Sequence, residues 1–224
     1  MNLSFMTRNY RHCLKGTLDG HTYGVESVEF GKGNILASGS HDNSIKIWNA
    51  KNGQLIKTLN RHTVVVRNVL FGKGNILASG SHDYSIKIWN EENLQLIKTL
   101  NRHTVVVINV AFGKGNILAS GSHDNCIKIW NEENGQLIKT LNRHTVVVIN
   151  VAFGKGNILA SGSDVCSIKI WNEENGQLIR TLNWHTSLVK SVAFGPGNIL
   201  ASGSSDSSIK IWNAEYGQLF RFLN

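Results

Sequence analysis

Histidine, serine and aspartate recur together along this chain, and they are the residue types of a hydrolytic triad. His62, Ser79 and Asp83 form one such set. Hydrolysis would require the histidine within hydrogen-bonding reach of the serine hydroxyl, and a carboxylate that orients the histidine. The same three types return along the chain, however, while one active site needs only one copy. No Gly-x-Ser-x-Gly nucleophile motif accompanies them. The repetition therefore favours a structural role.

A metal site is the second chemistry that the histidines could support. His41, His82 and His123 each stand directly before an aspartate in three successive repeats. Zinc needs its nitrogen ligands within about 2.1 Å of one point, whereas equivalent residues of successive units diverge around a ring. The glycines of the turn at 72–75 lack both the phosphate-binding motif and its strand-to-helix context. We therefore expect no catalytic residue, no metal and no cofactor.

The cysteines suggest neither a disulfide framework nor a metal cluster. Cys13, Cys126 and Cys166 are unevenly spaced and form no C-x-x-C pair, so we expect inert thiols in a reducing compartment. The first residues do not combine a basic segment with a long apolar core, and no run of 18 apolar residues occurs. The sequence thus predicts a soluble, cytoplasmic protein without membrane association.

The residues that could do chemistry are carried by a repeat with a period of 41 residues. Each repeat contains one tryptophan between Ile-Lys-Ile and Asn, and these are Trp48, Trp89, Trp130, Trp171 and Trp212. Within 62–100, four runs have the composition and length of strands, namely 64–71, 76–81, 85–89 and 95–100. Short polar turns join them, and helical periodicity is missing. Each repeat therefore predicts an antiparallel four-stranded sheet.

A sheet this small cannot bury both of its faces alone. Ile86 and Ile88 point to one face and Trp89 to the other, so neighbours must cover both. Sheets stacked face to face around an axis satisfy this requirement. The fold class is therefore all-β, a β-propeller of four-stranded antiparallel blades, and we expect five blades that close into a ring.

The residues at 75–90, Asn-Ile-Leu-Ala-Ser-Gly-Ser-His-Asp-Tyr-Ser-Ile-Lys-Ile-Trp-Asn, resemble the WD-repeat signature. The resemblance covers 12–224, which leaves 1–11 as an N-terminal tail. Two features depart from the signature. The closing Trp-Asp is Trp-Asn in all five repeats, and the usual Gly-His occurs only in the first unit.

The resemblance implies a buried tetrad of His, Ser, Asp and Trp that ties the strands of each blade together. A buried indole N–H, a hydroxyl and an imidazole each require a partner, and a chain of hydrogen bonds satisfies all three. The implied tetrads are His21, Ser38, Asp42 and Trp48; His62, Ser79, Asp83 and Trp89; His103, Ser120, Asp124 and Trp130; His144, Ser161 and Trp171; and His185, Ser202, Asp206 and Trp212. The fourth set lacks its aspartate. Val165 stands at that position with Asp164 one place early, so we expect blade four to be the weakest.

The resemblance also implies that the end of the propeller called the top binds peptides and proteins. The corresponding contact positions are Val65, Arg67, His82, Val106, Ile108, His123, Val147, Ile149, Leu188 and Lys190. These positions are apolar in blades three and four. Contiguous exposed apolar surface is uncommon in a monomer unless a partner covers it. The alternative is that these valines are ordinary strand residues left from recent copying.

The ends of the chain leave the closure of the propeller open. The outer strand occurs six times, because both 13–18 and 218–223 fit it. In the family the first of these completes the last blade like a clasp, whereas local pairing of the second has the smaller loop-closure cost. Repeats two and three differ at only five aligned positions. Nearly interchangeable interfaces favour domain swapping or self-association.

A non-catalytic scaffold for peptide or protein partners is the function that these patterns favour. The net charge of +8 is spread around the repeats, and glutamates interleave with the lysines, so nucleic acid is not the expected partner. A repeat protein or propeller fragment that assembles with other chains, without a dedicated partner, is the alternative. A propeller hydrolase would need one blade with unrepeated polar residues, and no repeat has them.

Overall fold

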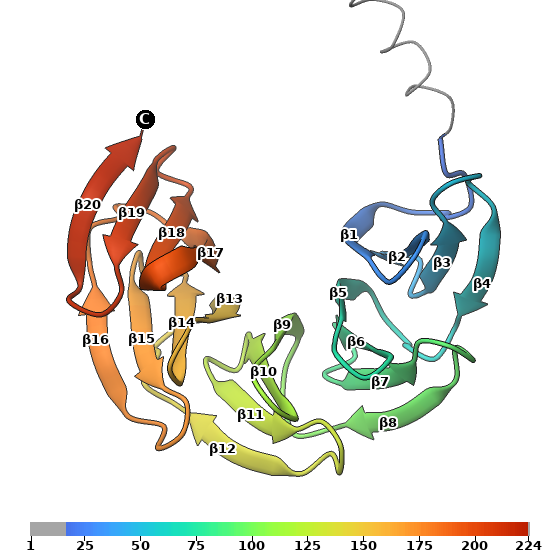
Figure 1. Cartoon of the computed structure of the whole chain (residues 1–224), viewed down its shortest axis with the longest axis horizontal. Coiled ribbons are helices and arrows are strands. Elements are labelled where there is room, and N and C mark those ends of the chain that lie inside the picture. The colour runs from blue at the N-terminus through green and yellow to red at the C-terminus, as the bar shows by residue number, and fades with distance from the viewer. Residues whose placement is uncertain (1–16, 224) are drawn as a thin grey trace, which may run out of the picture.

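The computed structural model describes residues 17–223, which form five four-stranded antiparallel sheets (Figure 1). In each sheet the strands pair in chain order. The expected fold class, an all-β propeller with five four-stranded blades, is confirmed.

The blades repeat one another closely in their strand bounds. The first three blades are β1 (Val25–Phe30), β2 (Ile35–Ser40), β3 (Ile45–Asn49) and β4 (Leu55–Leu59); β5 (Val66–Phe71), β6 (Ile76–Ser81), β7 (Ile86–Asn90) and β8 (Leu96–Leu100); and β9 (Val107–Phe112), β10 (Ile117–Ser122), β11 (Ile127–Asn131) and β12 (Leu137–Leu141). The last two are β13 (Val148–Phe153), β14 (Ile158–Ser163), β15 (Ile168–Asn172) and β16 (Leu178–Leu182); and β17 (Val189–Phe194), β18 (Ile199–Ser204), β19 (Ile209–Asn213) and β20 (Gln218–Leu223). A short 3-10 helix, η1 (Pro196–Asn198), stands where the other blades have a turn.

The turn between the first two strands of a blade shows how sequence fixes local structure. In blade two, Gly74 and Asn75 have φ of 75° and 60°. Two successive left-handed residues match the twist of a tight hairpin, and glycine and asparagine tolerate that conformation. The glycine is left-handed at this place in every blade, whereas the asparagine is left-handed only in blades two, four and five, so the glycine is the constant feature of the turn.

The hydrophobic core is divided among the junctions between blades. One cluster joins Ile45 and Ile47 of blade one to Val66, Leu77 and Trp89 of blade two, and three equivalent clusters join the following pairs. From blade two to blade five, the indole of each blade thus packs toward the preceding blade. Neither face of a blade can be buried without its neighbours, as the sequence predicts.

The five blades form an open arc. β1, β5, β9, β13 and β17 lie on its inner side, and β4, β8, β12, β16 and β20 on its outer side (Figure 1). Consecutive inner strands pack on one another, whereas strands of blade one and blade five are not among the packed pairs. The expected closed ring is therefore not formed, because each junction turns the next blade by too small an angle for five blades to complete a circle.

The last blade is completed locally. β20 pairs with β19 from Asn213 with Gln218 to Ile209 with Leu223. The clasp segment 13–18 lies outside the described residues except for Thr17 and Leu18, which are not in a strand. The tail expected at 1–11 lies wholly outside them. Within 17–223, no helix is long and apolar enough to span a membrane.

Candidate functional site

In blade two, the structure brings the residues of the implied tetrad into one chain of hydrogen bonds. Trp89 Nε1–H donates to Ser79 Oγ at 3.0 Å, and Ser79 Oγ lies 2.7 Å from His62 Nε2. His62 Nδ1 lies 2.7 Å from Asp83 Oδ2. When Nδ1–H donates to the carboxylate, Nε2 accepts the serine hydroxyl, so every donor has one acceptor. The bonds tie β7, β6 and the turn before β5 together.

The pKa values fix the charges of this chain. Burial lowers the pKa of His62, and the hydrogen bond that His62 donates to Asp83 only partly opposes it, so the imidazole is neutral. Burial alone would raise the pKa of Asp83, but hydrogen bonds from His62 and Ser85 outweigh it and hold the pKa well below its usual range. The pair is therefore a neutral imidazole bonded to a carboxylate.

The same geometry recurs in blades one, three and five. The imidazole Nδ1 lies 2.7 Å from the aspartate in each of them, at His21 and Asp42, His103 and Asp124, and His185 and Asp206. The serines Ser38, Ser120 and Ser202 each bond both the imidazole and the indole of their own blade.

These serines are poor candidates for a nucleophile. Ser79 and Ser120 are fully buried, and the oxygen of each already accepts an indole N–H. A substrate would have to displace the tryptophan from the core to reach that oxygen. The arrangement is suited to holding three strands together and leaves no room for acyl transfer.

Blade four has only part of the network. His144 Nε2 lies 2.7 Å from Ser161 Oγ, which accepts Trp171 Nε1–H at 2.8 Å. His144 Nδ1, however, is buried without a hydrogen-bond partner. Val165 is exposed at the aspartate position, and Asp164 is also exposed. Asp164 thus does not replace the missing carboxylate. Burial and then Lys169 lower the pKa of His144 to about 3.

The backbone of blade four nevertheless follows the other blades. Asp164 N–H donates to Val147 O at 3.2 Å, just as His123 N–H donates to Val106 O at 3.0 Å in blade three. The defect is therefore one of side-chain identity at Val165. The backbone register is unchanged.

The top-face positions divide into a polar and an apolar half. In blades one and two, Arg67 Nη1 lies 2.8 Å from Glu26 Oε2, and His41 contacts the same carboxylate. Burial lowers the pKa of His82, and the positive charges of Arg67, His123 and His41 lower it further.

The apolar half lies in blades three to five. Its apolar members are half-buried: Val106, Ile108, Val147, Ile149 and Leu188. Val65 of blade two is also half-buried, whereas Lys190 and His123 are exposed. The aliphatic positions therefore present partial surfaces to solvent, next to exposed polar groups.

One exposed aromatic residue was missed by the sequence reasoning. Trp184 is 65% exposed and stands directly before the tetrad histidine His185. The sequence signal was present, because Trp184 is the only tryptophan that does not fit the period of 41, and the equivalent residues are Gly20, Arg61, Arg102 and Arg143. Exposed tryptophan is enriched at the centres of protein interfaces.

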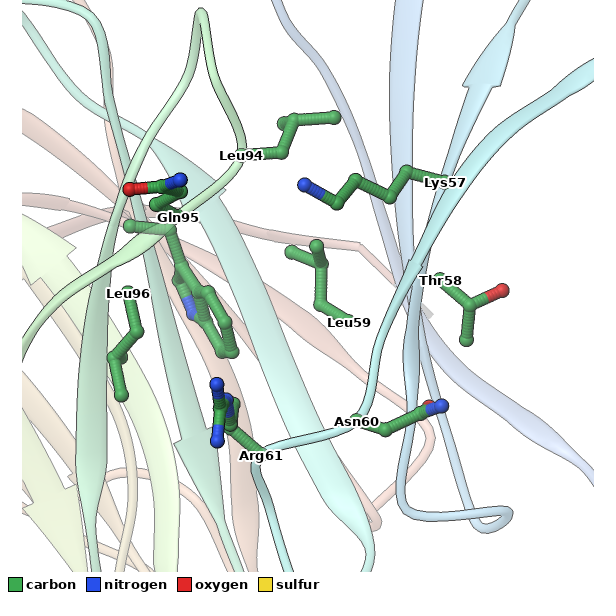
Figure 2. Close-up of a pocket in the computed structure, with 9 residues that line it drawn as sticks. Lys57, Thr58, Leu59, Asn60, Arg61, Leu94, Gln95 and Leu96 are labelled. Atoms are coloured by element: carbon green, nitrogen blue, oxygen red, sulfur yellow. The ribbon is translucent and has the colours of Figure 1, made fainter.

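A pocket of about 720 Å³ lies between the outer strands of blades one and two (Figure 2). Figure 2 shows Lys57, Leu59 and Arg61 on one side and Leu94 and Leu96 on the other. Leu94 has φ of 58°, at the position where the next blade has Gly135. A Cβ on Gly135 would lie 3.1 Å from Leu100 Cδ2, so glycine allows the neighbouring outer strand to approach. Leu94 thus lines the pocket at a position where the other four blades have glycine.

The inner strands line the middle of the arc, where a propeller hydrolase would place its site. The side-chain oxygens of Asn68, Asn109 and Asn150 each accept the N–H of a valine in the next blade, at 2.9 to 3.0 Å. These amides are therefore used in holding the blades together. Within 17–223, no group of three His, Cys, Asp or Glu residues is arranged to hold a metal ion.

Four segments of this chain match a known repeat family. The WD domain, G-beta repeat family matches residues 12–49, 53–90, 94–131 and 176–213. Residues 135–172, which contain Val165, are not among the matched segments.

The similar proteins are much longer than the part that matches. The protein named probable E3 ubiquitin ligase complex SCF subunit sconB of Talaromyces marneffei is 43% identical over 49 residues, which are 22% of this chain and 7% of that protein. The protein of the same name from Arthroderma benhamiae is 45% identical over 49 residues, with the same shares.

A solved structure resembles most of the arc. The computationally designed Ika8 protein has a TM-score of 0.82 and 35% identity, and the match covers 92% of this chain and 63% of that chain. This chain therefore spans less than two thirds of the designed protein. Since the family match covers more than half of the residues and the blades have the corresponding fold, the chain belongs to the WD domain, G-beta repeat family.

Proposed function

We propose that this protein is a non-catalytic scaffold that binds peptide or protein partners on the top face of its blades. The observation that supports the proposal most is the composition of that face. A half-buried aliphatic row, from Val106 and Ile108 to Val147 and Ile149, lies between a polar cluster around Glu26 and the exposed Trp184. Interfaces commonly combine apolar anchors with a polar rim.

The tetrads support the non-catalytic part of the proposal. Their serines are buried and bonded, and they recur from blade to blade as a structural network would. In the middle of the arc, blade one has a carboxylate, Glu29, where the other blades have Leu70, Ala111, Ala152 and Ala193. A single carboxylate does not supply the base and nucleophile pair that hydrolysis needs.

The relatives support protein partners in general. They are named as subunits of an E3 ubiquitin ligase complex, but they match only 49 residues of this chain. We infer from this that the repeat, as a protein-binding unit, is what this chain shares with them. A cytoplasmic location is part of the proposal and is supported by the free thiols of Cys126 and Cys166.

The proposal is tested by affinity capture with quantitative mass spectrometry. The intact protein is compared with the variant Val106→Asp/Ile149→Asp and with Lys190→Glu, which changes an exposed side chain. Partners of the top face should be retained by the intact protein and lost from the variants. Circular dichroism and thermal melting establish that each variant is folded.

The matched control is Ile97→Asp, which places the same charge on an exposed residue of the outer strand β8. This variant should capture the same proteins as the intact chain. Equal capture by all four proteins would mean that partners do not bind the top face.

A further inference from the structure

The four junctions between blades are built from the same three contacts. The first is a valine inserted against a glycine. A Cβ added to Gly39 would lie 2.8 Å from Val66 Cγ1, and one added to Gly80 would lie 2.9 Å from Val107 Cγ1. The valines Val66, Val107, Val148 and Val189 are all fully buried in this way. The glycine is therefore the hole into which the next blade inserts its valine.

The second contact is a phenylalanine over a glycine, and the third is a hydrogen bond to the backbone. A Cβ added to Gly31 would lie 2.9 Å from the ring of Phe71 in the next blade. Ser27 Oγ accepts Val69 N–H at 3.2 Å. At the other junctions, an asparagine takes the place of Ser27.

Blade five ends with these holes empty. Nothing lies within 4 Å of a Cβ added to Gly203, and the nearest atom to one added to Gly195 is its own Ile199 O at 3.8 Å. Ile209 is 48% exposed, although Ile45, Ile86, Ile127 and Ile168, its equivalents in the other blades, are fully buried. The far side of blade five thus has the form of an unfilled junction.

Blade one begins with the matching side chains exposed. Val25, Val28 and Phe30 are 51%, 59% and 70% exposed, although their equivalents in the other four blades are buried or half-buried. These are the valine that fills the glycine hole, the valine whose N–H is bonded, and the phenylalanine that covers the second glycine.

Blade one and blade five each lack one partner of a hydrogen bond that forms at the first junction. At the first junction, Lys32 N–H donates to Glu91 Oε1 at 3.2 Å. The residue equivalent to Lys32 in blade five is Pro196, which has no N–H, and the residue equivalent to Glu91 in blade one is Ala50, which has no carboxylate. A junction between these two blades would therefore leave neither group unsatisfied. Ser191 stands where Ser27 does, and it could accept the N–H of Val28.

We propose that two copies of this chain associate head to tail, with blade one of one copy seated on blade five of the other as a fifth junction. Val25 then fills the hole over Gly203, and Phe30 covers Gly195. The two surfaces of this contact are different parts of the chain, so each associated pair still has one free surface of each kind. The chains therefore either close into a larger ring or continue as an open oligomer. The inference concerns the ends of the arc and is independent of top-face binding.

Thr17 and Leu18 must move when blade five of one copy binds blade one of another. A Cβ added to Gly53 would lie 3.3 Å from Leu18 Cδ2, and one added to Gly135 or Gly176 would meet Leu100 or Leu141 of the preceding outer strand at 3.1 Å. Leu18 thus occupies the place where the outer strand of a preceding blade would end. Association brings β20 of the incoming copy to this place, so the proposal includes a displacement of Thr17 and Leu18.

A disulfide trap tests the proposed contact. The Cβ atoms of valine and an added glycine Cβ lie 3.3 to 3.6 Å apart at the four internal junctions, close to the mean of about 3.8 Å for disulfides. One variant has Val25→Cys and the other Gly203→Cys, both in a chain whose three natural cysteines are changed to serine. Mixed under oxidising conditions, they should form a cross-linked species of twice the chain mass that neither variant forms alone.

The control is a disulfide between the equivalent valine and glycine of an internal junction. Gly80→Cys/Val107→Cys should form a disulfide within one chain, which establishes that the junction geometry permits the bond. If this control is cross-linked and the mixture is not, the proposal is wrong. It is also wrong if Val25→Cys/Gly203→Cys forms only a disulfide within one chain, because the ends of one copy would then meet each other.

Discussion

At the scale of residues, blade four provides a natural test of what the tetrad contributes. His144 keeps its bond to Ser161 but has a buried Nδ1 without a partner, and the backbone around Val165 follows that of the complete blades. An unsatisfied buried polar group costs about 1 to 3 kcal/mol. One carboxylate should therefore repair the blade.

We predict that Asp164→His/Val165→Asp, which copies the His-Asp sequence of blade three, raises the free energy of unfolding by about 1 to 3 kcal/mol. Urea denaturation followed by tryptophan fluorescence measures the change. The converse variant, Asp124→Val in blade three, should lower the free energy by a similar amount. An unchanged midpoint in both variants would mean that the carboxylate does not support the imidazole.

The histidines also predict how stability depends on pH. Burial lowers the pKa of His62, His103 and His144 in the folded chain, and that of His144 falls to about 3. The unfolded chain, with pKa values of about 6.5, therefore binds more protons below that pH. Stability should fall as the pH drops below about 6.5, by up to about 1.4 kcal/mol per pH unit for each such histidine.

Urea midpoints measured between pH 7.5 and about 4.5 check this prediction, a range that stays above the usual aspartate pKa of about 3.9. The variant Asp164→His/Val165→Asp gives His144 a carboxylate partner, which raises its pKa, so the slope should become shallower. A midpoint independent of pH across the range would contradict neutral, buried histidines.

At the scale of elements, the repeat predicted the strand boundaries of blade two to within one residue, except that it placed the start of the first strand two residues too early. The run at 64–71 was expected as a strand, and β5 begins at Val66. Val64 and Val65 have strand composition, yet the chain turns there. Ser81 Oγ–H donates to Val64 O at 3.1 Å, which helps to hold the turn that carries His62 over the blade. Tertiary bonds override the β-propensity of the valines.

The hydrogen bonds that side chains make between blades could not be predicted from the sequence of a single repeat. Asn109 and its equivalents have the composition of ordinary strand residues, and their role depends on how the next blade is placed. The pocket that Leu94 lines could not be predicted either, since the sequence there shows only one leucine in place of a glycine. The period identifies the blade, whereas the contacts between blades depend on packing that the period does not encode.

A matched pair of substitutions tests the bond between blades. Asn109 Oδ1 accepts Val151 N–H at 2.9 Å, so Asn109→Ala should strand a buried N–H and lower the free energy of unfolding by about 1 to 3 kcal/mol. Ser191→Ala changes the equivalent residue of blade five, which has no sixth blade to bond. At low protein concentration, it should leave the urea midpoint unchanged. Equal effects of both variants would argue against the bond as the cause.

At the scale of the whole molecule, the sequence predicted the number of blades and their topology, but not the open arc. Closure depends on the angle at each junction, and five nearly identical repeats do not reveal that angle. The second outer strand that the sequence left unassigned, 218–223, belongs to blade five as β20. The ends of the arc thus remain available, with Val25 and Phe30 on one side and Gly203 and Gly195 on the other.

Sedimentation velocity over a series of concentrations tests the open ends most directly. We predict that the mass of the unsubstituted protein rises above the 24.8 kDa of one chain as concentration increases. Gly203→Val should abolish the rise without unfolding the blade, because a Cβ there meets nothing in the free arc but fills the hole for Val25. A single species of 24.8 kDa at every concentration would mean that the ends of the arc do not associate.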